Sequence, residues 1–465
     1  MGRREHRAII PNMDARLQSA FAALVGEKHV LAAPQDTAPY TTDWRRQYHG
    51  AALGVLRPAS TAEVAALVGL CAKEGIAIVP QGGNTGLVGG SVPTGTRREI
   101  VLSLGRMNRI RALDALNDTV TVEAGCVLAA VQSAADEAGR LFPLSLAAEG
   151  SCQIGGNLST NAGGVNVLRY GNAREQVLGL EVVLPDGRVW DGLRGLRKDN
   201  TGYDLKQLFL GAEGTLGVIT AAVLRLYPKP AASATAWIAV QSPRDAVELL
   251  AALRERLGER ISAFELISRA CLEAVLRHVK DLKDPLPAPH PWYVLAQLAD
   301  SGGAAELEER AAEALAGREA VLAQSGEQAR NLWRIRESIP EAQFTNVKHD
   351  ISLPVSRIPD FVERAGRELR ALFPDAQIYC FGHVGDGNLH YNVGPERLLE
   401  KRAAVSRVVY DAVASLRGSI SAEHGLGQLK REEIRAHKPP LELELMRKVK
   451  AALDPHGVMN PGKVL

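Results

Sequence analysis

The sequence has 465 residues, of which 46% are hydrophobic and 23% charged, and its formal net charge is +2. A chain of this length predicts two or more domains, each with its own core. The near-neutral charge, without a basic run, gives no support for binding to nucleic acid or to a membrane surface. No stretch approaches the roughly eighteen apolar residues of a membrane span, so we expect no transmembrane segment.

The cysteines and the N-terminus bear on the compartment. The five cysteines are scattered, odd in number and without CxxC spacing, which is typical of reduced intracellular thiols. Residues 1–6 carry charge but are followed by no apolar core or cleavage site, so we expect no secretory signal. The sequence therefore predicts a cytoplasmic protein.

The N-terminal part begins with helices and strands in alternation. Residues 12–30 have apolar side chains at helical spacing and predict an amphipathic helix. Ser60 and Glu63 form a capping box that opens a helix ending at Gly75, and residues 76–79 follow as a short strand. This order indicates an α/β unit.

A glycine-rich loop, PQGGNTGLVGGS, follows that strand at residues 80–91 and has five glycines in twelve residues. Exposed N–H groups in such a loop can bind phosphate oxygens, whereas a mobile surface loop is the alternative. The loop is neither a Walker loop nor a GxGxxG fingerprint. By itself this stretch leaves phosphate binding and flexibility equally open.

Two further glycine clusters lie at residues 150–164 and 211–220. A strand is expected at 119–123, a helix at 127–138, and a hairpin around the Pro-Asp-Gly turn at 185–187. Three glycine clusters in one α/β segment indicate one large, extended ligand, because chance flexibility explains three of them poorly.

The C-terminal half predicts an α+β domain that follows a proline-rich linker at residues 227–230. Strands are expected at 235–240 and 292–298, and helices at 246–256 and 304–322. This order of elements is compatible with an antiparallel sheet.

Two cationic side chains in this half, Arg336 and Lys348, are candidates for binding a carboxylate substrate. Taken alone, such residues are more often surface charges. The sequence therefore leaves both interpretations open.

A hairpin carrying two histidines is predicted where two apolar runs flank a Gly-Asp-Gly-Asn turn. His383 and His390 come close together in such a hairpin, and His390 shares a strand face with Asn392. Downstream, Glu423 and His424 add a carboxylate and a third imidazole. Two histidines and a carboxylate suit a catalytic divalent metal, whereas a lone histidine is more often structural.

Together these segments resemble the FAD-dependent D-2-hydroxyacid dehydrogenases of the vanillyl-alcohol-oxidase flavoprotein superfamily, from about residue 41 onward. The motifs that carry the resemblance are PQGGNTGLVGGS, GGNLSTNAGG, GAEGTLGVIT, GHVGDGNLHYN, SAEHGLG and NPGK. The resemblance implies an α+β fold with an FAD-binding domain of two α/β subdomains at residues 1–228. It also implies a cap domain with an antiparallel sheet at 229–420, and a segment at 421–465 that returns to the FAD-binding domain.

The resemblance further implies non-covalent FAD, because Asn84 stands where covalently linked relatives often have a histidine. The first glycine loop would bind the FAD pyrophosphate. The residues assigned to the cofactor come from all three glycine clusters, their neighbours and the C-terminal motif: Pro80, Gln81, Gly82, Gly83, Asn84, Thr85, Gly86, Gly90, Ser91, Glu149, Gly150, Ile154, Gly155, Gly156, Asn157, Thr160, Asn161, Gly163, Gly164, Glu213, Gly214, Gly217, Ile219 and Asn460.

For the active site, the resemblance implies a divalent metal, zinc, together with a general base and a set of substrate-binding side chains. The metal ligands are His383, His390 and Glu423, and the general base is His424. The substrate-binding side chains are Arg336, Lys348 and Asn392. One residue departs from the pattern. Pro340 stands four residues after Arg336, where hydroxyglutarate-specific members often have Thr, and this leaves the substrate open.

The implied reaction is the oxidation of a D-2-hydroxy acid, in which the metal acidifies the hydroxyl, His424 takes its proton and FAD accepts the hydride. D-2-hydroxyglutarate, giving 2-oxoglutarate, is favoured over D-lactate or glycolate, because two cationic residues can hold two carboxylates. The expected partners are this small-molecule acid and an external electron acceptor, either electron-transfer flavoprotein or a quinone, and we also consider a homodimer.

Two rival interpretations come from other classes of protein. A flavin-free metallohydrolase would use the histidine and glutamate site, but it leaves the glycine clusters unexplained. A non-catalytic flavin subunit of an oxidase complex should lack an intact base and metal site.

Overall fold

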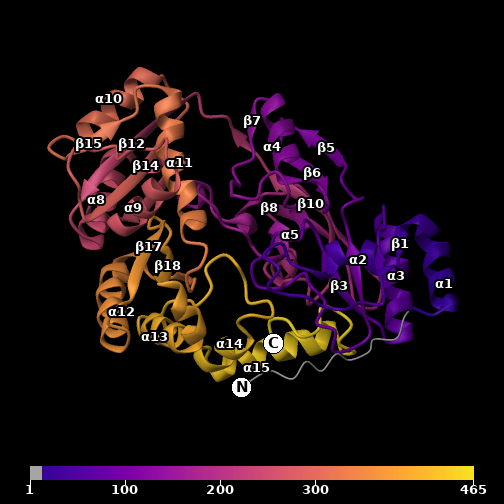
Figure 1. The fold of residues 1–465 in the computed structure, drawn as a ribbon. Coiled ribbons are helices and arrows are strands. Elements are labelled where there is room, and N and C mark those ends of the chain that lie inside the picture. Colours follow the sequence, from indigo (N-terminus) through magenta and orange to yellow (C-terminus); the bar gives the residue numbers. More distant parts are fainter. Residues whose placement is uncertain (1–12) are drawn as a thin grey trace.

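A computed structural model describes residues 13–465, and Figure 1 shows its N-terminal and C-terminal halves side by side. The expectations for residues 1–12 lie outside the described residues. The first sheet of the N-terminal half has the order β1 (Val30–Leu31), β2 (Val55–Leu56), β4 (Glu99–Ser103) and β3 (Ala77–Gln81), with β2 and β3 parallel to β4. Helix α3 (Thr61–Glu74) connects β2 to β3. The predicted capping box begins it, and Gly75 ends it at φ 64°.

The second sheet of this half is antiparallel. Its order is β5 (Ile110–Asp114), β6 (Thr119–Glu123), β10 (Val218–Arg225), β8 (Val177–Val183) and β9 (Val189–Gly192). The hairpin of β8 and β9 confirms the turn predicted at residues 185–187. A short pair, β7 (Arg140–Leu141) with β11 (Tyr227–Pro228), accompanies this sheet. The other helices of this half are α1 (Ala15–Val25), α2 (Pro34–Thr41), α4 (Leu128–Glu137), α5 (Ile154–Ser159), α6 (Val167–Tyr170) and α7 (Lys206–Phe209).

The C-terminal half is built on one antiparallel sheet, as predicted. Its order is β15 (Ala320–Leu322), β12 (Ala232–Val240), β14 (Trp292–Asp300), β13 (Ile261–Ser268), β17 (Gln377–His383), β18 (Asn388–Gly394) and β16 (Asp350–Ser352). Side chains alternate between the faces of a strand, so each face of this sheet has its own core. Helices α8 (Pro243–Leu257), α10 (Ala304–Ala314), α12 (Ile358–Leu372) and α13 (Arg402–Ser415) cover one face. Helices α9 (Arg269–His278) and α11 (Gly326–Ala342) cover the other.

Two helix predictions are too long. The helix predicted at 304–322 ends at Ala314, and residues 320–322 are instead strand β15, paired with β12. Gly317 adopts φ 83° in the connection, a conformation that a continuing helix does not allow. The helix predicted at 12–30 ends at Val25, where Gly26 has φ 85°.

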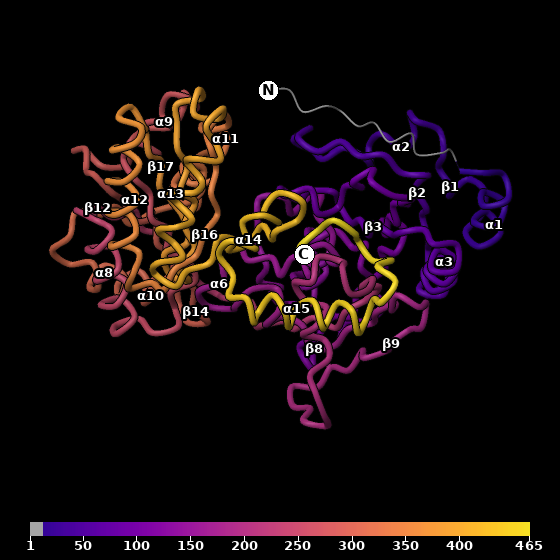
Figure 2. The backbone as a smooth tube through the Cα atoms, turned by 90° about the horizontal axis from the view of Figure 1, so that it is seen from below, coloured from indigo at the N-terminus to yellow at the C-terminus, as the bar shows by residue number. Residues whose placement is uncertain are grey.

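The chain after α13 crosses back beneath the N-terminal half, as Figures 1 and 2 show. Helices α14 (Arg431–His437) and α15 (Pro440–Leu453) lie on this return path, and Met459 forms a parallel bridge with Ile78 of β3. The five cysteines are buried and free. Within residues 13–465, we find no helix with the length and apolar character needed to cross a membrane.

Candidate active site

The hairpin of β17 and β18 brings His383 and His390 together, as predicted. Residue His390 pairs with Phe381, two positions before His383, and the centroids of the two imidazole rings are 5.9 Å apart. The strands approach closely at Gly382, where a Cβ atom would lie 2.7 Å from the carbonyl oxygen of Asn388. A glycine is therefore needed for this hairpin geometry.

Glu423 completes a group of donor atoms with these two histidines, which we call the donor group. One ligand atom from each of His383, His390 and Glu423 lies within 4.8 Å of the other two. Two imidazoles and a carboxylate form a donor set that catalytic Zn²⁺ takes while leaving a coordination position open. The residues therefore fit the divalent metal that the sequence predicts. A second group, formed by Asp350, Glu423 and His424, meets the same distance limit and shares Glu423.

His424 lies next to the donor group but differs from its histidines in exposure. Its ring stacks on that of His390 with 6.0 Å between centroids, and its side chain is 30% exposed. Nδ1 of His424 lies 3.5 Å from a carboxylate oxygen of Asp350. The other ring nitrogen, Nε2, makes no hydrogen bond within the described part of the chain, which suits a proton acceptor.

Asp350 is a buried acid that fixes the loop carrying Glu423 and His424. Its Oδ2 accepts hydrogen bonds from the backbone N–H groups of Glu423 at 2.9 Å and His424 at 3.0 Å, and its Oδ1 accepts one from the amide of Asn388. Burial acts to raise the pKa of Asp350, but the charge of His424 and of neighbouring cations holds this pKa below its ordinary value. The role of Asp350 was missed from the sequence, although it lies only two residues after the predicted substrate-binding Lys348.

Glu265 is a second buried acid that was missed from the sequence. Its Oε1 accepts a hydrogen bond from Nδ1 of His383 at 2.5 Å, and its Oε2 accepts one from Nε of Arg336 at 2.7 Å. Burial acts to raise the pKa of Glu265, but the charges of His383 and Arg336 lower it to about 2. Burial acts to lower the pKa of His383, but Glu265 raises it to about 9. The sequence does carry a signal for Glu265, because it is the single acid in an otherwise uncharged strand, β13.

Helix α11 and the residues after it carry the predicted substrate-binding cations. The guanidinium of Arg336 lies 4.9 Å from the centroid of the Phe381 ring. Lys348 donates from Nζ to the carbonyl oxygen of Pro340 at 3.1 Å, one helical turn beyond Arg336. Burial, followed by the charge of Arg45, lowers the pKa of Lys348 to about 8. Both cations therefore lie along the C-terminal part of one helix.

Asn392, the third predicted substrate-binding residue, has an engaged side chain. Its amide nitrogen donates to Oε1 of Gln343 at 3.1 Å, and the residue is 3% exposed. Its carbonyl side-chain oxygen is the group left for a substrate or a metal-bound ligand.

The second glycine cluster reaches the donor group from the N-terminal half. The N–H of Gly164 donates to Oε1 of Glu423 at 2.6 Å. Leu168 of α6 fills the space beside Gly385 in the hairpin, where a Cβ atom would lie 2.7 Å from Leu168. The loops predicted to bind a cofactor are therefore contiguous with the residues predicted to bind a metal.

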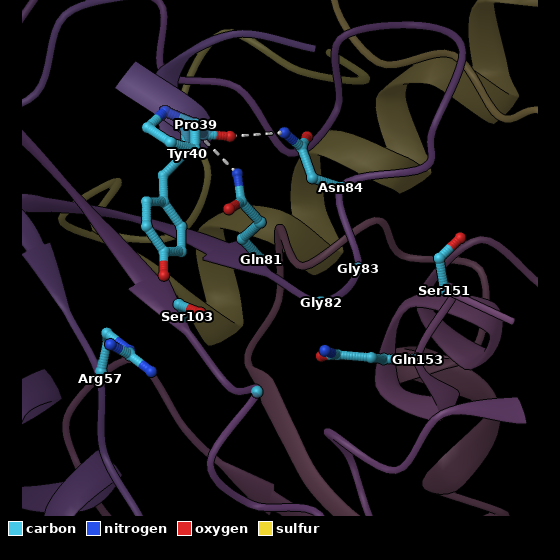
Figure 3. Close-up of a pocket in the computed structure, with 11 residues that line it drawn as sticks. Pro39, Tyr40, Arg57, Gln81, Gly82, Gly83, Asn84, Ser103, Ser151 and Gln153 are labelled. Carbon is cyan, nitrogen blue, oxygen red and sulfur yellow. Dashed lines mark hydrogen bonds between the residues drawn. The ribbon is translucent and has the colours of Figure 1, made fainter. Parts of the chain in front are cut away.

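A cavity of about 330 Å³ lies between the first two glycine clusters. Figure 3 shows the residues that line it: Pro39, Tyr40, Arg57, Gln81, Gly82, Gly83, Asn84, Ser103, Gly105, Ser151 and Gln153. A Cβ atom on Gly83 would lie 2.1 Å from the carbonyl oxygen of Ser151, so the two loops meet there through backbone alone. Oε1 of Gln153 is buried without a hydrogen-bond partner among residues 13–465. A polar, glycine-walled cavity with an unpartnered amide fits part of a dinucleotide cofactor.

Four residues of the predicted FAD set, Gln81 to Asn84, line this cavity. Its other lining residues are outside that set: Pro39, Tyr40, Arg57, Ser103, Gly105, Ser151 and Gln153. Members of the set also connect loops or lie in the core. Asn84 donates to the carbonyl oxygens of Pro39 and Thr42 and accepts from Ser91. Ile219, on β10, is buried in the core of the N-terminal half.

Glu213 and Asn460, also in the predicted FAD set, join the third glycine cluster to the C-terminal segment. The carboxylate of Glu213 accepts hydrogen bonds from the N–H groups of Leu426 and Gly427 at 2.7 and 2.8 Å. The amide of Asn460 donates to the carbonyl oxygens of Gly90 and Glu213. Their contact with FAD stays a prediction.

Comparison with known proteins gives one matching family model for each half of the chain. The family model "FAD binding domain" matches residues 52–192, and "FAD linked oxidases, C-terminal domain" matches residues 229–464. Two solved structures share the fold at low identity. The structure of p-cresol methylhydroxylase has a TM-score of 0.75 at 19% identity and covers 96% of this chain and 95% of that one. The structure of alkyldihydroxyacetonephosphate synthase has a TM-score of 0.74 at 17% identity, over 98% of this chain and 86% of that one.

Curated relatives are much more similar in sequence. The mitochondrial D-2-hydroxyglutarate dehydrogenase of Bos taurus is 43% identical over 94% of this chain and 81% of its own length. The D-2-hydroxyglutarate dehydrogenase of Xanthomonas citri pv. viticola is 39% identical over 96% of both chains. These matches confirm the predicted resemblance and its α+β fold. The chain is an FAD-linked oxidoreductase that belongs to the D-2-hydroxyglutarate dehydrogenase family.

Proposed function

We propose that this protein oxidises D-2-hydroxyglutarate to 2-oxoglutarate. The observation that carries the proposal is that Glu265 joins a member of the donor group, His383, to the carboxylate-binding Arg336. A metal-assisted proton acceptor and a receptor for carboxylate therefore belong to one site. The names of the curated relatives support the same substrate.

The residues of the chain would divide the work as follows. His424 would take the proton of the substrate hydroxyl at Nε2, because its Nδ1 faces Asp350. Arg336 and Lys348 would bind the two carboxylates and orient the Cα–H bond. When bound at the donor group and the glycine loops, a divalent cation would lower the pKa of the hydroxyl and FAD would accept the two electrons.

A dicarboxylate is favoured because both cations are available. Among residues 13–465, no carboxylate forms an ion pair with Lys348, and Arg336 uses only Nε toward Glu265. Most of the Lys348 population is protonated at neutral pH if its pKa is about 8. D-lactate and glycolate, the alternatives within the family, would leave one cation without a partner.

We further propose Zn²⁺ as the metal, non-covalent FAD, and an external acceptor, either electron-transfer flavoprotein or a quinone. The domain limits 1–228, 229–420 and 421–465 and a homodimer are also proposed. The proposed location is the cytoplasm. The Bos taurus relative is named as mitochondrial, so fractionation of the source cells is the measurement that distinguishes the two compartments.

The experiment that tests the reaction is a panel of D-2-hydroxy acids with a dye acceptor, before and after chelation of metals. We expect the highest kcat/KM with D-2-hydroxyglutarate, loss of turnover on chelation and recovery with Zn²⁺. A preference for D-lactate would favour the alternative substrate. Full turnover after complete removal of metal would contradict the metal assignment, and a flavin-loaded protein that oxidises no acid would favour a non-catalytic subunit.

A further inference from the structure

Glu265 lies at the centre of the antiparallel sheet of the C-terminal half, which we call the cap sheet. It is on β13, between β14 and β17. Every residue of β13 is buried, and the side chain of Glu265 is fully inaccessible to solvent. A buried carboxylate without partners costs several kcal/mol, and the cost falls only when charged groups hydrogen-bond to it. The free-energy cost of burying Glu265 therefore depends on the hydrogen-bond partners of its two carboxylate oxygens.

Each oxygen of Glu265 has a different partner. Oε1 accepts from Nδ1 of His383, the residue directly opposite Glu265 in the pairing of β13 with β17. Oε2 accepts from Nε of Arg336, which projects from α11 on the same side of the sheet. One carboxylate thus holds a predicted metal ligand and a predicted substrate-binding residue.

The contact with His383 determines which of its nitrogens can bind a metal. Glu265 is an acceptor, so Nδ1 of His383 carries the proton and the lone pair of the neutral ring is on Nε2. Carboxylates that accept from the second nitrogen of a histidine ligand fix its tautomer and ring orientation.

The contact with Arg336 leaves the other end of its guanidinium free. Nε is used by Glu265, and the ring of Phe381 lies 4.9 Å from the guanidinium carbon. Within the described part of the chain, neither terminal nitrogen of Arg336 has a hydrogen-bond acceptor. A planar group held in this way presents two parallel N–H donors, as bidentate binding of a carboxylate requires.

We propose that Glu265 is a positioning residue that sets His383 for metal binding and Arg336 for substrate binding at the same time. The inference rests on the proposed function, because it concerns the same site. Its consequence is that metal affinity and the affinity for a carboxylate substrate fall together when Glu265 is changed.

The substitution Glu265→Gln distinguishes the hydrogen bonds that the carboxylate accepts from the packing of the side chain. Glutamine has nearly the same shape, but its amide offers one acceptor and one donor instead of two acceptors. It can therefore accept from His383 or from Arg336, but not from both. If the amide nitrogen faces His383, Nδ1 must become the acceptor, and Nε2 then carries the proton that blocks metal binding.

A matched control is available in the N-terminal half. The side chain of Glu123 on β6 is also 0% exposed, and it pairs with Arg109 at 2.8 Å. Glu123→Gln therefore makes the same chemical change outside the active site, at a buried carboxylate whose partner Arg109 is largely exposed. Glu265→Asp is a second variant of the active site, since it keeps the charge but is too short to hold both partners as the wild type does.

The test uses the flavin-loaded, metal-stripped protein. Zn²⁺ affinity is measured by competition with a chromogenic chelator, and the visible spectrum of a Co²⁺-loaded sample reports the ligand geometry. Steady-state kinetics after saturating Zn²⁺ has been restored give KM for D-2-hydroxyglutarate. We expect Glu265→Gln to weaken Zn²⁺ binding by about 10–100-fold, to change the Co²⁺ spectrum and to raise KM. Glu265→Asp should move the same quantities in the same direction, and Glu123→Gln should leave all three unchanged.

Unchanged Zn²⁺ affinity and KM in both Glu265 variants would overturn the inference, as would an equal loss in Glu123→Gln. If Glu265→Gln fails to retain flavin, Glu265→Asp supplies the same comparison. A wild-type protein that binds no Zn²⁺ would overturn the metal part of the proposed function. In that case a raised KM in the Glu265 variants would still support the positioning of Arg336, and an unchanged KM would overturn it.

Discussion

The backbone N–H of Gly164 donates a hydrogen bond to Oε1 of Glu423 over 2.6 Å. Gly164 belongs to the second glycine cluster of the N-terminal half, whereas Glu423 belongs to the segment that follows the cap sheet. One member of the donor group is therefore held in part by a hydrogen bond from the N-terminal half of the chain. Gly163, next to this bond, has no side chain at the point where Glu423 approaches.

We predict that Gly163→Ala weakens metal binding. The added Cβ atom would lie 2.4 Å from Oε1 of Glu423, so the carboxylate must shift from its place in the donor group. Loss of one well-placed donor should lower Zn²⁺ affinity by at least about tenfold and lower kcat with it. Chelator competition and the dye-linked assay measure the two effects.

Gly69→Ala is the control for this prediction. Gly69 lies within α3, where a Cβ atom would meet no atom within 4 Å, and alanine in a helix is favoured over glycine by about 0.5–1 kcal/mol. The control should keep full Zn²⁺ affinity and gain stability. Wild-type Zn²⁺ affinity in Gly163→Ala would show that Glu423 does not bind the metal in this position.

His424→Ala should abolish turnover while the protein keeps its flavin. A positioned general base contributes about 10²–10⁴-fold to the rate. The side chain of His424 is 30% exposed, against 8% for His383 and 16% for His390. The change in kcat is measured with the dye acceptor, and the flavin content from its absorbance. Undiminished kcat in the flavin-loaded variant would contradict the assignment of the base.

Much of the fold and of the candidate site follows from local sequence patterns. The alternation of side chains and the Gly-Asp-Gly-Asn turn were sufficient to predict the hairpin of β17 and β18. Once the hairpin is predicted, the proximity of His383 and His390 follows from it. The capping box at Ser60 likewise predicted the start of α3.

The residues that local patterns did not reveal act through contacts between distant parts of the chain. Glu265 and His383 are 118 residues apart, and their contact exists because β13 pairs with β17 in the middle of a sheet. Asp350 meets the loop of His424 only after that loop has returned from α13. Strand β15 was missed for a related reason: residues 320–322 become a strand by pairing with β12, which overrides their continuation of a helical pattern.

The metal-free protein should lose stability in the alkaline range because of His383. The pKa of His383 is about 9 in the folded state, above the ordinary value of about 6.5, so protonation of this ring favours folding. Its contribution is fully present below about pH 6.5 and is lost as the pH rises through about 9. Comparison of Tm for the metal-free wild type and His383→Gln should give a gap that narrows between about pH 6 and pH 9.5.

The control for this pH dependence is His437→Gln, because Nε2 of His437 lies 3.0 Å from a carboxylate oxygen of Asp411, outside the donor group. This variant makes the same chemical change away from Glu265, so its gap from the wild type should not narrow as the pH rises through about 9. A gap for His383→Gln that is constant across the range would show that the ring is not held protonated by Glu265.

Pro340→Thr should shift the enzyme further toward the dicarboxylate substrate. Position 340 follows Arg336 by four residues in α11, so a threonine hydroxyl would lie on the same helix face as the guanidinium. The carbonyl oxygen of residue 340 would still accept from Lys348, since that bond involves only the backbone of this residue. A new hydrogen bond to the second carboxylate is worth about 1 kcal/mol, so KM for D-2-hydroxyglutarate should fall about fivefold while KM for D-lactate changes little. Pro340→Ala, which removes the ring without adding a hydroxyl, should not reproduce this selectivity, and an equal change in both KM values would place the second carboxylate away from residue 340.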